Sequence, residues 1–217
     1  MSRKGACALL AVMVAGLTGA APLTESVLSG CTPAGTVRYL SACVYAGKEP
    51  KVAEIVADVS GLDEVSLVTW TGGDASACDY ADWLEARFEG GDAPVYVSDL
   101  PLAFAWTFGG DQWRCPDFAR AQVRKDRSTL DSGLSCGGQP FAKGLGVQAP
   151  SLIVVKVPSG AKRLVAKGRI DDVAATHVQG SQASAQFAVL AGLPAKGITA
   201  LLDLPQVLPS ETRAAIA

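Results

Sequence analysis

The stretch that decides the fold is Phe141-Ala-Lys-Gly-Leu-Gly-Val-Gln-Ala-Pro-Ser151. Its centre, Gly144-Leu-Gly-Val-Gln-Ala149, fits the loose G-x-G-x-x-A pattern of dinucleotide-binding turns, which need a strand before the glycines and a helix after them. Here Pro150 follows at once, and residues 152–157 are a β-branched run of the kind that favours strands. No helix N-terminus is available for a pyrophosphate, so the stretch indicates paired strands and not a nucleotide site.

Two further motifs flank this stretch: Asp126-Arg-Ser128 precedes it and Gly168-Arg-Ile-Asp-Asp172 follows it. A D-[RK]-S turn, a Y/F-x-K-G-L-G block, a paired strand and a G-[VI]-D-D element occur in this order in the NPCBM family of carbohydrate-binding modules, which are appended to glycoside hydrolases. This part of the chain resembles that family, and the resemblance implies a β-sandwich of the galactose-binding-domain type. The chain departs from the family at Gln148, where a histidine is usual, and so keeps a hydrogen-bonding side chain without the titratable ring.

A second block resembles the end of such a domain, yet it comes first in this chain. It comprises residues 59–70, Gly72-Gly-Asp74 and residues 79–88. Two interpretations stay open: residues 35–90 and 95–192 are the exchanged halves of one permuted sandwich, or the chain is a stretch of a tandem array. We favour one sandwich, because permutation is easy when termini lie close together and the combined length suits one domain.

The composition indicates a folded, exported protein. Only 18% of the residues are charged and 49% are hydrophobic, so a sizeable core is feasible. Arg3 and Lys4, the apolar residues 6–17 and the small residues up to Ala20 form the pattern of a signal peptide over residues 1–20. That apolar stretch is too short to span a bilayer. Loss of the two basic residues leaves an acidic chain without a basic stripe, which argues against nucleic-acid binding.

The cysteines suit an oxidising compartment. Cys7 leaves with the signal, and the other five show no C-x-x-C spacing, while the chain has a single histidine, so a zinc or redox site is not indicated. We expect disulfides, with Cys115–Cys136 and Cys43–Cys78 as hypothetical pairs.

Cys31 is then the odd cysteine: lipidated, free or paired with another chain. Leu28-Ser-Gly-Cys31 would suit a lipoprotein cleavage box, but Glu25 lies in what should be an uncharged run before it. A lipid anchor at Cys31 is therefore the less favoured reading.

The chain predicts an all-β, jelly-roll-type β-sandwich with one short helix and an irregular C-terminal tail. Turn residues separate the apolar runs at intervals that suit a sandwich better than a βαβ repeat. The short helix is expected over residues 81–88, after Asp79 as N-cap, and three prolines make residues 193–217 a tail. The expected strands are residues 36–45, 51–59, 64–69, 94–97, 141–147, 152–157, 163–168 and 184–190.

Glycan recognition needs an aromatic face for the sugar ring and a few polar groups for its hydroxyls. Trp106 and Trp113 are expected in a glycine-containing loop over residues 105–114 and are the candidate platforms, with a core position as the alternative. Arg127 and Gln148 are the candidate polar ligands. Arg127 has the alternative of pinning its own turn, and Gln148 that of satisfying buried backbone.

Five carboxylates in turn-rich segments have the hard oxygen ligands that calcium prefers. The resemblance implies a structural calcium ion held by Asp79, Asp82, Asp171 and Asp172, with Asp74 nearby. The alternative is that these aspartates cap turns and need no metal.

An enzyme is not indicated. A glycosidase needs a cleft that encloses the scissile bond, and the one histidine, His177, has no G-x-S-x-G elbow beside it. The sequence therefore predicts a secreted, non-catalytic module that binds a glycan, with terminal galactose-type sugars as the ligand the resemblance implies. The alternative is a structural or adhesive cell-surface module that has the fold without sugar binding.

Overall fold

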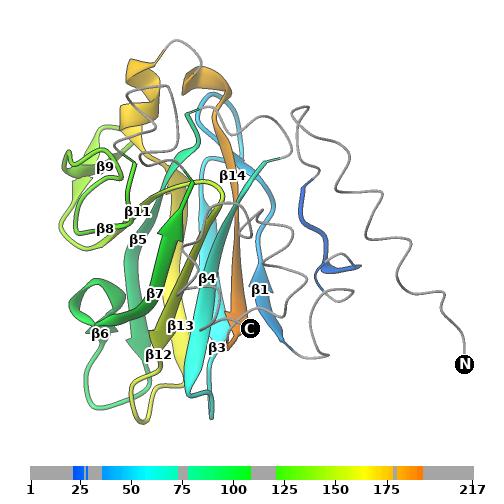
Figure 1. The fold of residues 1–217 in the computed structure, drawn as a ribbon, viewed down its shortest axis with the longest axis vertical. Coiled ribbons are helices and arrows are strands. Elements are labelled where there is room, and N and C mark those ends of the chain that lie inside the picture. Colours follow the sequence, from blue (N-terminus) through cyan, green and yellow to red (C-terminus); the bar gives the residue numbers. More distant parts are fainter. Residues whose placement is uncertain are drawn as a thin grey trace, which may run out of the picture.

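The strands of this chain form two six-stranded antiparallel sheets and one small hairpin (Figure 1). The computed structural model describes residues 22–26, 28, 36–72, 78–108, 121–177 and 180–192. The predicted all-β sandwich is confirmed. The predicted signal (1–20) and tail (193–217) lie outside the described residues, as do Cys31, Asp74, Trp113 and Cys115.

Sheet A has the strand order β1-β14-β4-β12-β7, with β2 also paired to β14. Its central strands are buried on both faces, which explains their continuous apolar sequences. The strands are β1 (Val37–Leu40), β2 (Val44–Tyr45), β4 (Glu64–Thr71), β7 (Leu102–Thr107), β12 (Ser151–Lys156) and β14 (Ser184–Ala191).

Sheet B has the order β3-β13-β5-β11-β8, with β6 also paired to β5. The edge strand β3 alternates buried and exposed residues, as a half-covered strand does. The strands are β3 (Ala53–Asp58), β5 (Tyr80–Glu89), β6 (Val95–Tyr96), β8 (Arg124–Lys125), β11 (Gly144–Gln148) and β13 (Arg163–Ile170). The hairpin is β9 (Leu134–Cys136) with β10 (Gln139–Phe141), and the 3₁₀ turns are η1 (Val97–Asp99), η2 (Asp172–Thr176) and η3 (Gly180–Gln182).

Strands from the two halves of the chain alternate within both sheets. In sheet A, β4 lies between β14 and β12, and in sheet B, β5 lies between β13 and β11. Each half therefore supplies the hydrogen-bonding neighbours of the other, and neither sheet is complete without both. Whether this order arose by permutation or in a tandem array stays open.

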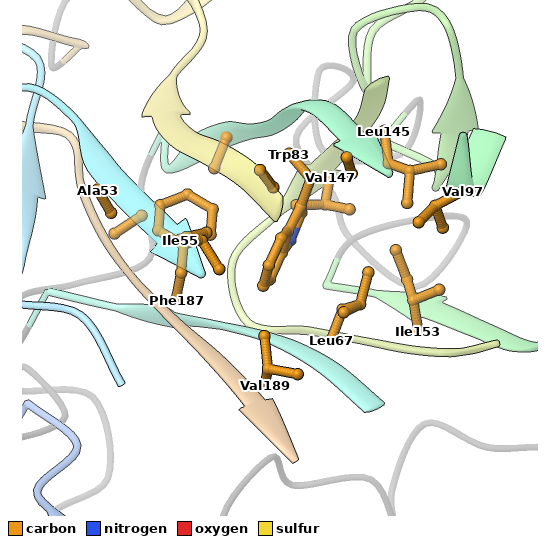
Figure 2. Packing of buried hydrophobic residues seen from close by; sticks show 14 of the residues in the cluster. Ala53, Ile55, Leu67, Trp83, Val97, Leu145, Val147, Ile153, Phe187 and Val189 are labelled. Atoms are coloured by element: carbon orange, nitrogen blue, oxygen red, sulfur yellow. The ribbon is translucent and has the colours of Figure 1, made fainter. Parts of the chain in front are cut away.

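The core between the sheets is built around Trp83 of β5 (Figure 2). Its ring meets the ring of Phe187 from β14 edge to face, with centroids 5.1 Å apart. Its Nε1 donates to Thr69 Oγ1 at 2.9 Å, so this buried N–H is paired across the two sheets. Gly168 leaves room for the Phe187 ring, because a Cβ there would lie 2.5 Å from it.

The predicted helix over residues 81–88 is wrong: these residues belong to strand β5. Core-facing residues of β5 are spaced by two, then three, then two, as Ala81, Trp83, Ala86 and Phe88. The three-residue step comes from a bulge at Glu85, which has a φ of +51°. At this bulge the pairing with β13 shifts register. The bulge imitates a helical spacing, and pairing on both sides overrides the helix propensity of alanine and leucine.

Other strand predictions need smaller corrections. The expected strand over residues 36–45 is two strands, β1 and β2, and Trp106 lies in the edge strand β7 instead of a loop. The sequence analysis also missed β8, β9 and β10, which are only two or three residues long and carry almost no periodic signal.

The described cysteines form no disulfide. Cys43 Sγ donates to the Gly72 carbonyl at 3.4 Å, and Cys136 Sγ donates to Asp82 Oδ2 at 3.4 Å. The predicted Cys43–Cys78 bond is therefore not made in this structure. Within the described ranges, no helix is long and apolar enough to cross a membrane.

Candidate functional site

The motifs meet where residues 126–143 cross the outer face of sheet B. Asp126 accepts hydrogen bonds from Lys143 Nζ at 3.0 Å and from Gly144 N at 3.1 Å. Burial opposes its ionisation, but the hydrogen bonds from Ser98, Lys143 and Gly144 outweigh that effect and lower the pKa of Asp126. Lys143 also pairs with Asp99. The two most recognisable motifs thus hold each other.

Arg127 pins its own turn. Its guanidinium donates to the Asp131 carbonyl and lies 2.8 Å from the Asp131 carboxylate, while its side chain remains 56% exposed. The turn rests directly on Gly146, where a Cβ would come within 2.5 Å of Thr129 N and closer still to the Arg127 carbonyl. The second glycine of the Gly-Leu-Gly motif is therefore required by backbone packing.

Asp172 clamps the tip of the β9–β10 hairpin. Its carboxylate accepts from Gly137 N at 2.6 Å, Gly138 N at 2.8 Å and Ser135 Oγ at 2.6 Å. Burial favours the neutral acid, but these three donors and the nearby Arg169 outweigh it and lower the pKa of Asp172. The last aspartate of the Gly-Arg-Ile-Asp-Asp motif is thus an ionised structural clamp.

Asp82 and Asp171 form a buried acid pair below this clamp. Burial raises the pKa of Asp82 well above 3.8, and the neighbouring Asp171 adds to that shift. Burial raises the pKa of Asp171 as well, so the neutral acid form of Asp82 is favoured. Asp171 still accepts from Val173 N at 2.7 Å as the N-cap of η2. Burial, with these carboxylates adding to it, raises the pKa of the Cys136 thiol.

The four predicted calcium ligands do not form one oxygen cage. Asp79 is fully buried and accepts from Ser184 N at 2.9 Å, whereas Asp172 faces the hairpin. Among the described residues, no three His, Cys, Asp or Glu side chains are placed to hold a metal ion. Calcium binding stays a prediction, and its test is the thermal midpoint with and without a chelator, because an ion bound to the native state raises that midpoint. An unchanged midpoint would refute it.

Trp106 lies on the outer face of sheet A, away from the motif cluster. It is 8% exposed and packs with Trp70, Leu152 and neighbouring apolar residues. Its ring face therefore offers no open platform to a sugar. Trp113, the second predicted platform, lies outside the described residues.

Gln148 is buried at the end of β11. Its backbone N–H and carbonyl both bond to Thr107 Oγ1, at 2.7 and 2.6 Å, and its Nε2 donates to the Ala149 carbonyl at 3.2 Å. These contacts match the backbone-satisfying alternative. His177 packs its ring on Tyr80, with centroids 5.2 Å apart.

The structure thus brings Asp82, Asp171 and Asp172 together, and leaves Arg127, Trp106 and Gln148 apart from them. The contacts of Lys143 with Asp126 and Asp99 were not predicted, because 17 and 44 residues separate the partners and no local periodicity links them. One shallow depression lies at the other end of the sandwich from η2, and it is lined by Gly61, Leu62, Asp63, Glu64, Lys156, Val157, Ala191 and Gly192.

Comparison with known proteins gives one family. Residues 94–196 match the model of the NPCBM/NEW2 domain, a span just under half of the 217-residue chain. Neither the curated proteins nor the solved structures gave a match. The matched span contains the turn at Asp126, the Lys143–Gly144 block and the Asp171–Asp172 pair. Residues 94–196 of this chain are therefore similar to the NPCBM/NEW2 domain, and this similarity indicates a carbohydrate-binding module.

Proposed function

We propose that this protein is an exported, non-catalytic module that binds terminal sugars of the galactose type. The observation that carries the proposal is the NPCBM/NEW2 match over residues 94–196 on a complete two-sheet sandwich.

In this proposal Trp113 supplies the aromatic platform, since Trp106 is buried in an apolar cluster. The segment that carries Trp113 leaves β7 at Phe108, whose N–H donates to the Pro150 carbonyl at 2.8 Å, and returns at Ala121. Of the two candidate polar ligands, Arg127 is closer in sequence to this segment than Gln148, and its side chain is 56% exposed. A guanidinium can donate to two neighbouring hydroxyls at once.

The test is a glycan array on the exported protein, followed by calorimetric titration of the best galactose-type ligand. We expect Trp113→Ala to weaken binding at least about tenfold, as loss of a stacking ring does, with an unchanged thermal midpoint. Arg127→Ala should also weaken binding, and Arg163→Ala is its matched control, because that arginine is similarly exposed and ion-paired. Equal binding by all three variants would contradict the assigned contacts.

The second candidate is a structural or adhesive surface module with the same fold. Burial of Trp106 and Gln148 favours it, because two of the four predicted sugar contacts point away from solvent. The absence of binding to any array sugar at millimolar concentration, from a protein with a cooperative unfolding transition, would support this candidate over the first.

A further inference from the structure

The outer face of sheet A carries an apolar patch that extends over β4, β7, β12 and β14. Residues that alternate with the core-facing ones on β4, β7, β12 and β14 form a second hydrophobic cluster on this side. An apolar sheet face of this extent is unstable against water and needs a cover. The cluster consists of Val68, Trp70, Trp106, Leu152, Val154, Ala188 and Leu190, with Leu23 and Leu28 packed among them.

Residues 22–26 and Leu28, which we call the strap, supply part of that cover. Leu23 is 6% exposed and Leu28 is fully buried, whereas Thr24, Glu25 and Ser26 face solvent. The Leu28 N–H donates to the Thr24 carbonyl at 3.0 Å, and both leucines pack into the same apolar cluster. Figure 1 shows the strap in dark blue beside β1.

A buried glutamine fastens the strap to the sheet. Gln186 of β14 is 4% exposed; its Oε1 accepts from Leu23 N at 2.7 Å and its Nε2 donates to the Leu23 carbonyl at 2.9 Å. The same Nε2 donates to the Ser41 carbonyl at 2.8 Å. The side-chain amide thus binds the strap backbone in both directions, as a neighbouring strand would. Without the strap, its buried oxygen loses the partner that Leu23 provides, which is costly.

We infer that the strap is a permanent part of the mature protein, and that export processing therefore ends before Pro22. Hydrolysis of the Ala20–Ala21 bond consumes one water and leaves a carboxylate on Ala20 and an ammonium on Ala21, with the strap intact. Processing at the Leu28-Ser-Gly-Cys31 box would instead cut before Cys31 and remove Leu23 and Leu28 together. The fold itself thus selects against lipid attachment at Cys31. This inference rests on the export proposed above and does not depend on sugar binding.

The first test is the N-terminus of the exported protein. The full chain is produced with its own leader in a bacterial host, and the N-terminal peptide of the exported protein is identified by mass spectrometry. We expect a first residue at or before Pro22 and an unmodified Cys31. A chain that begins at Cys31, or a lipid mass on that residue, would overturn the inference.

The second test asks whether the strap stabilises the sheet. We expect Leu28→Ala to lower the thermal midpoint by about 5 °C and to increase binding of a hydrophobic dye. Ser26→Ala, an exposed change in the same turn, should alter neither. Equal behaviour of the two variants would show that the strap is not docked.

A measurement on the unchanged protein covers the case in which Leu28→Ala fails to fold. Because Leu23 N–H and Leu28 N–H are both hydrogen-bonded and their residues are buried, their amide hydrogens should exchange slowly in the exported protein. Rapid exchange at both positions would contradict a permanently docked strap.

Discussion

The two sheets differ in what covers their outer faces. On sheet A, the cover packs through leucine side chains against a continuous apolar surface, and one glutamine fixes its position. On sheet B, residues 126–143 are held by carboxylates: Asp126 binds the Lys143–Gly144 backbone and ammonium, and Asp172 binds the hairpin tip. The apolar cover is non-directional, whereas the polar cover depends on the position of individual atoms.

This difference explains why one face is visible in family motifs and the other is not. A carboxylate that must accept from two N–H groups tolerates few substitutions, so the residues of such a clamp form a short recognisable pattern. An apolar patch accepts many side chains of suitable size, so its members are scattered over β4, β7, β12 and β14 without a motif. The NPCBM/NEW2 match spans the polar clamps of sheet B and also β7, β12 and β14 of sheet A.

The largest effect should follow from crowding the cover of sheet B. Gly146→Ala places a Cβ within 2.5 Å of Thr129 N, so the turn must lift away, and we expect a loss of about 3 kcal/mol in the free energy of unfolding. Urea denaturation measures it. Gly133→Ala is the control, because a Cβ there meets nothing within 4 Å. Equal losses in the two variants would refute the close contact.

A smaller effect should follow from removing the charge of the hairpin clamp. Asp172→Asn leaves one acceptor oxygen and places an amide NH2 group against N–H donors. We therefore expect the free energy of unfolding to decrease by about 2 kcal/mol at pH 7. The pKa of Asp172 is lowered in the folded state; its contribution is therefore present above the unfolded value of 3.8 and disappears as the pH falls through the folded value.

Chemical denaturation of both proteins at several pH values between 3 and 7 checks this prediction. The difference in the free energy of unfolding between Asp172→Asn and the original protein should decrease as the pH falls toward 3. Asp92→Asn, at an exposed carboxylate, should have almost the same free energy of unfolding as the original protein at every pH. A loss for Asp172→Asn that is the same at every pH would contradict an ionised clamp.

The smallest effect, with the opposite pH trend, is expected at Asp82. Its pKa is raised in the folded state, so the stability that its protonated form contributes is complete below 3.8 and is lost as the pH rises toward the folded value. Asparagine cannot ionise and can still donate to Asp171. We expect Asp82→Asn to change the free energy of unfolding by about 1 kcal/mol or less near pH 4. As the pH increases, the variant should become more stable relative to the original protein.

Denaturation at pH 4, 5.5, 7 and 8 measures this trend. As the pH rises, Asp82→Asn should become more stable relative to the original protein, whereas Asp172→Asn should become less stable relative to it. The same trend in both variants would show that the proton is not held by Asp82.

Residue types alone predicted most of the strands, because apolar runs separated by turn residues are a local property. The prediction failed at β5, where a bulge at Glu85 gives a helix-like spacing, and at β7, where Trp106 was read as part of a loop. Both errors arise from pairing with strands distant in the sequence. The burial of Gln148 and Trp106 could not be predicted from the sequence for the same reason, since it depends on what packs over them.

The sequence by itself determined the all-β class and the short motifs that contain Asp126, Lys143 and Asp172, because periodicity and motifs are written in neighbouring positions. Only the tertiary structure decided that β4 and β5 insert between strands of the other half, that Asp82 is buried beside Asp171, and that Leu23 and Leu28 cover a sheet face. These are relations between residues far apart in the chain. Their energies depend on burial and distance, which no local pattern encodes.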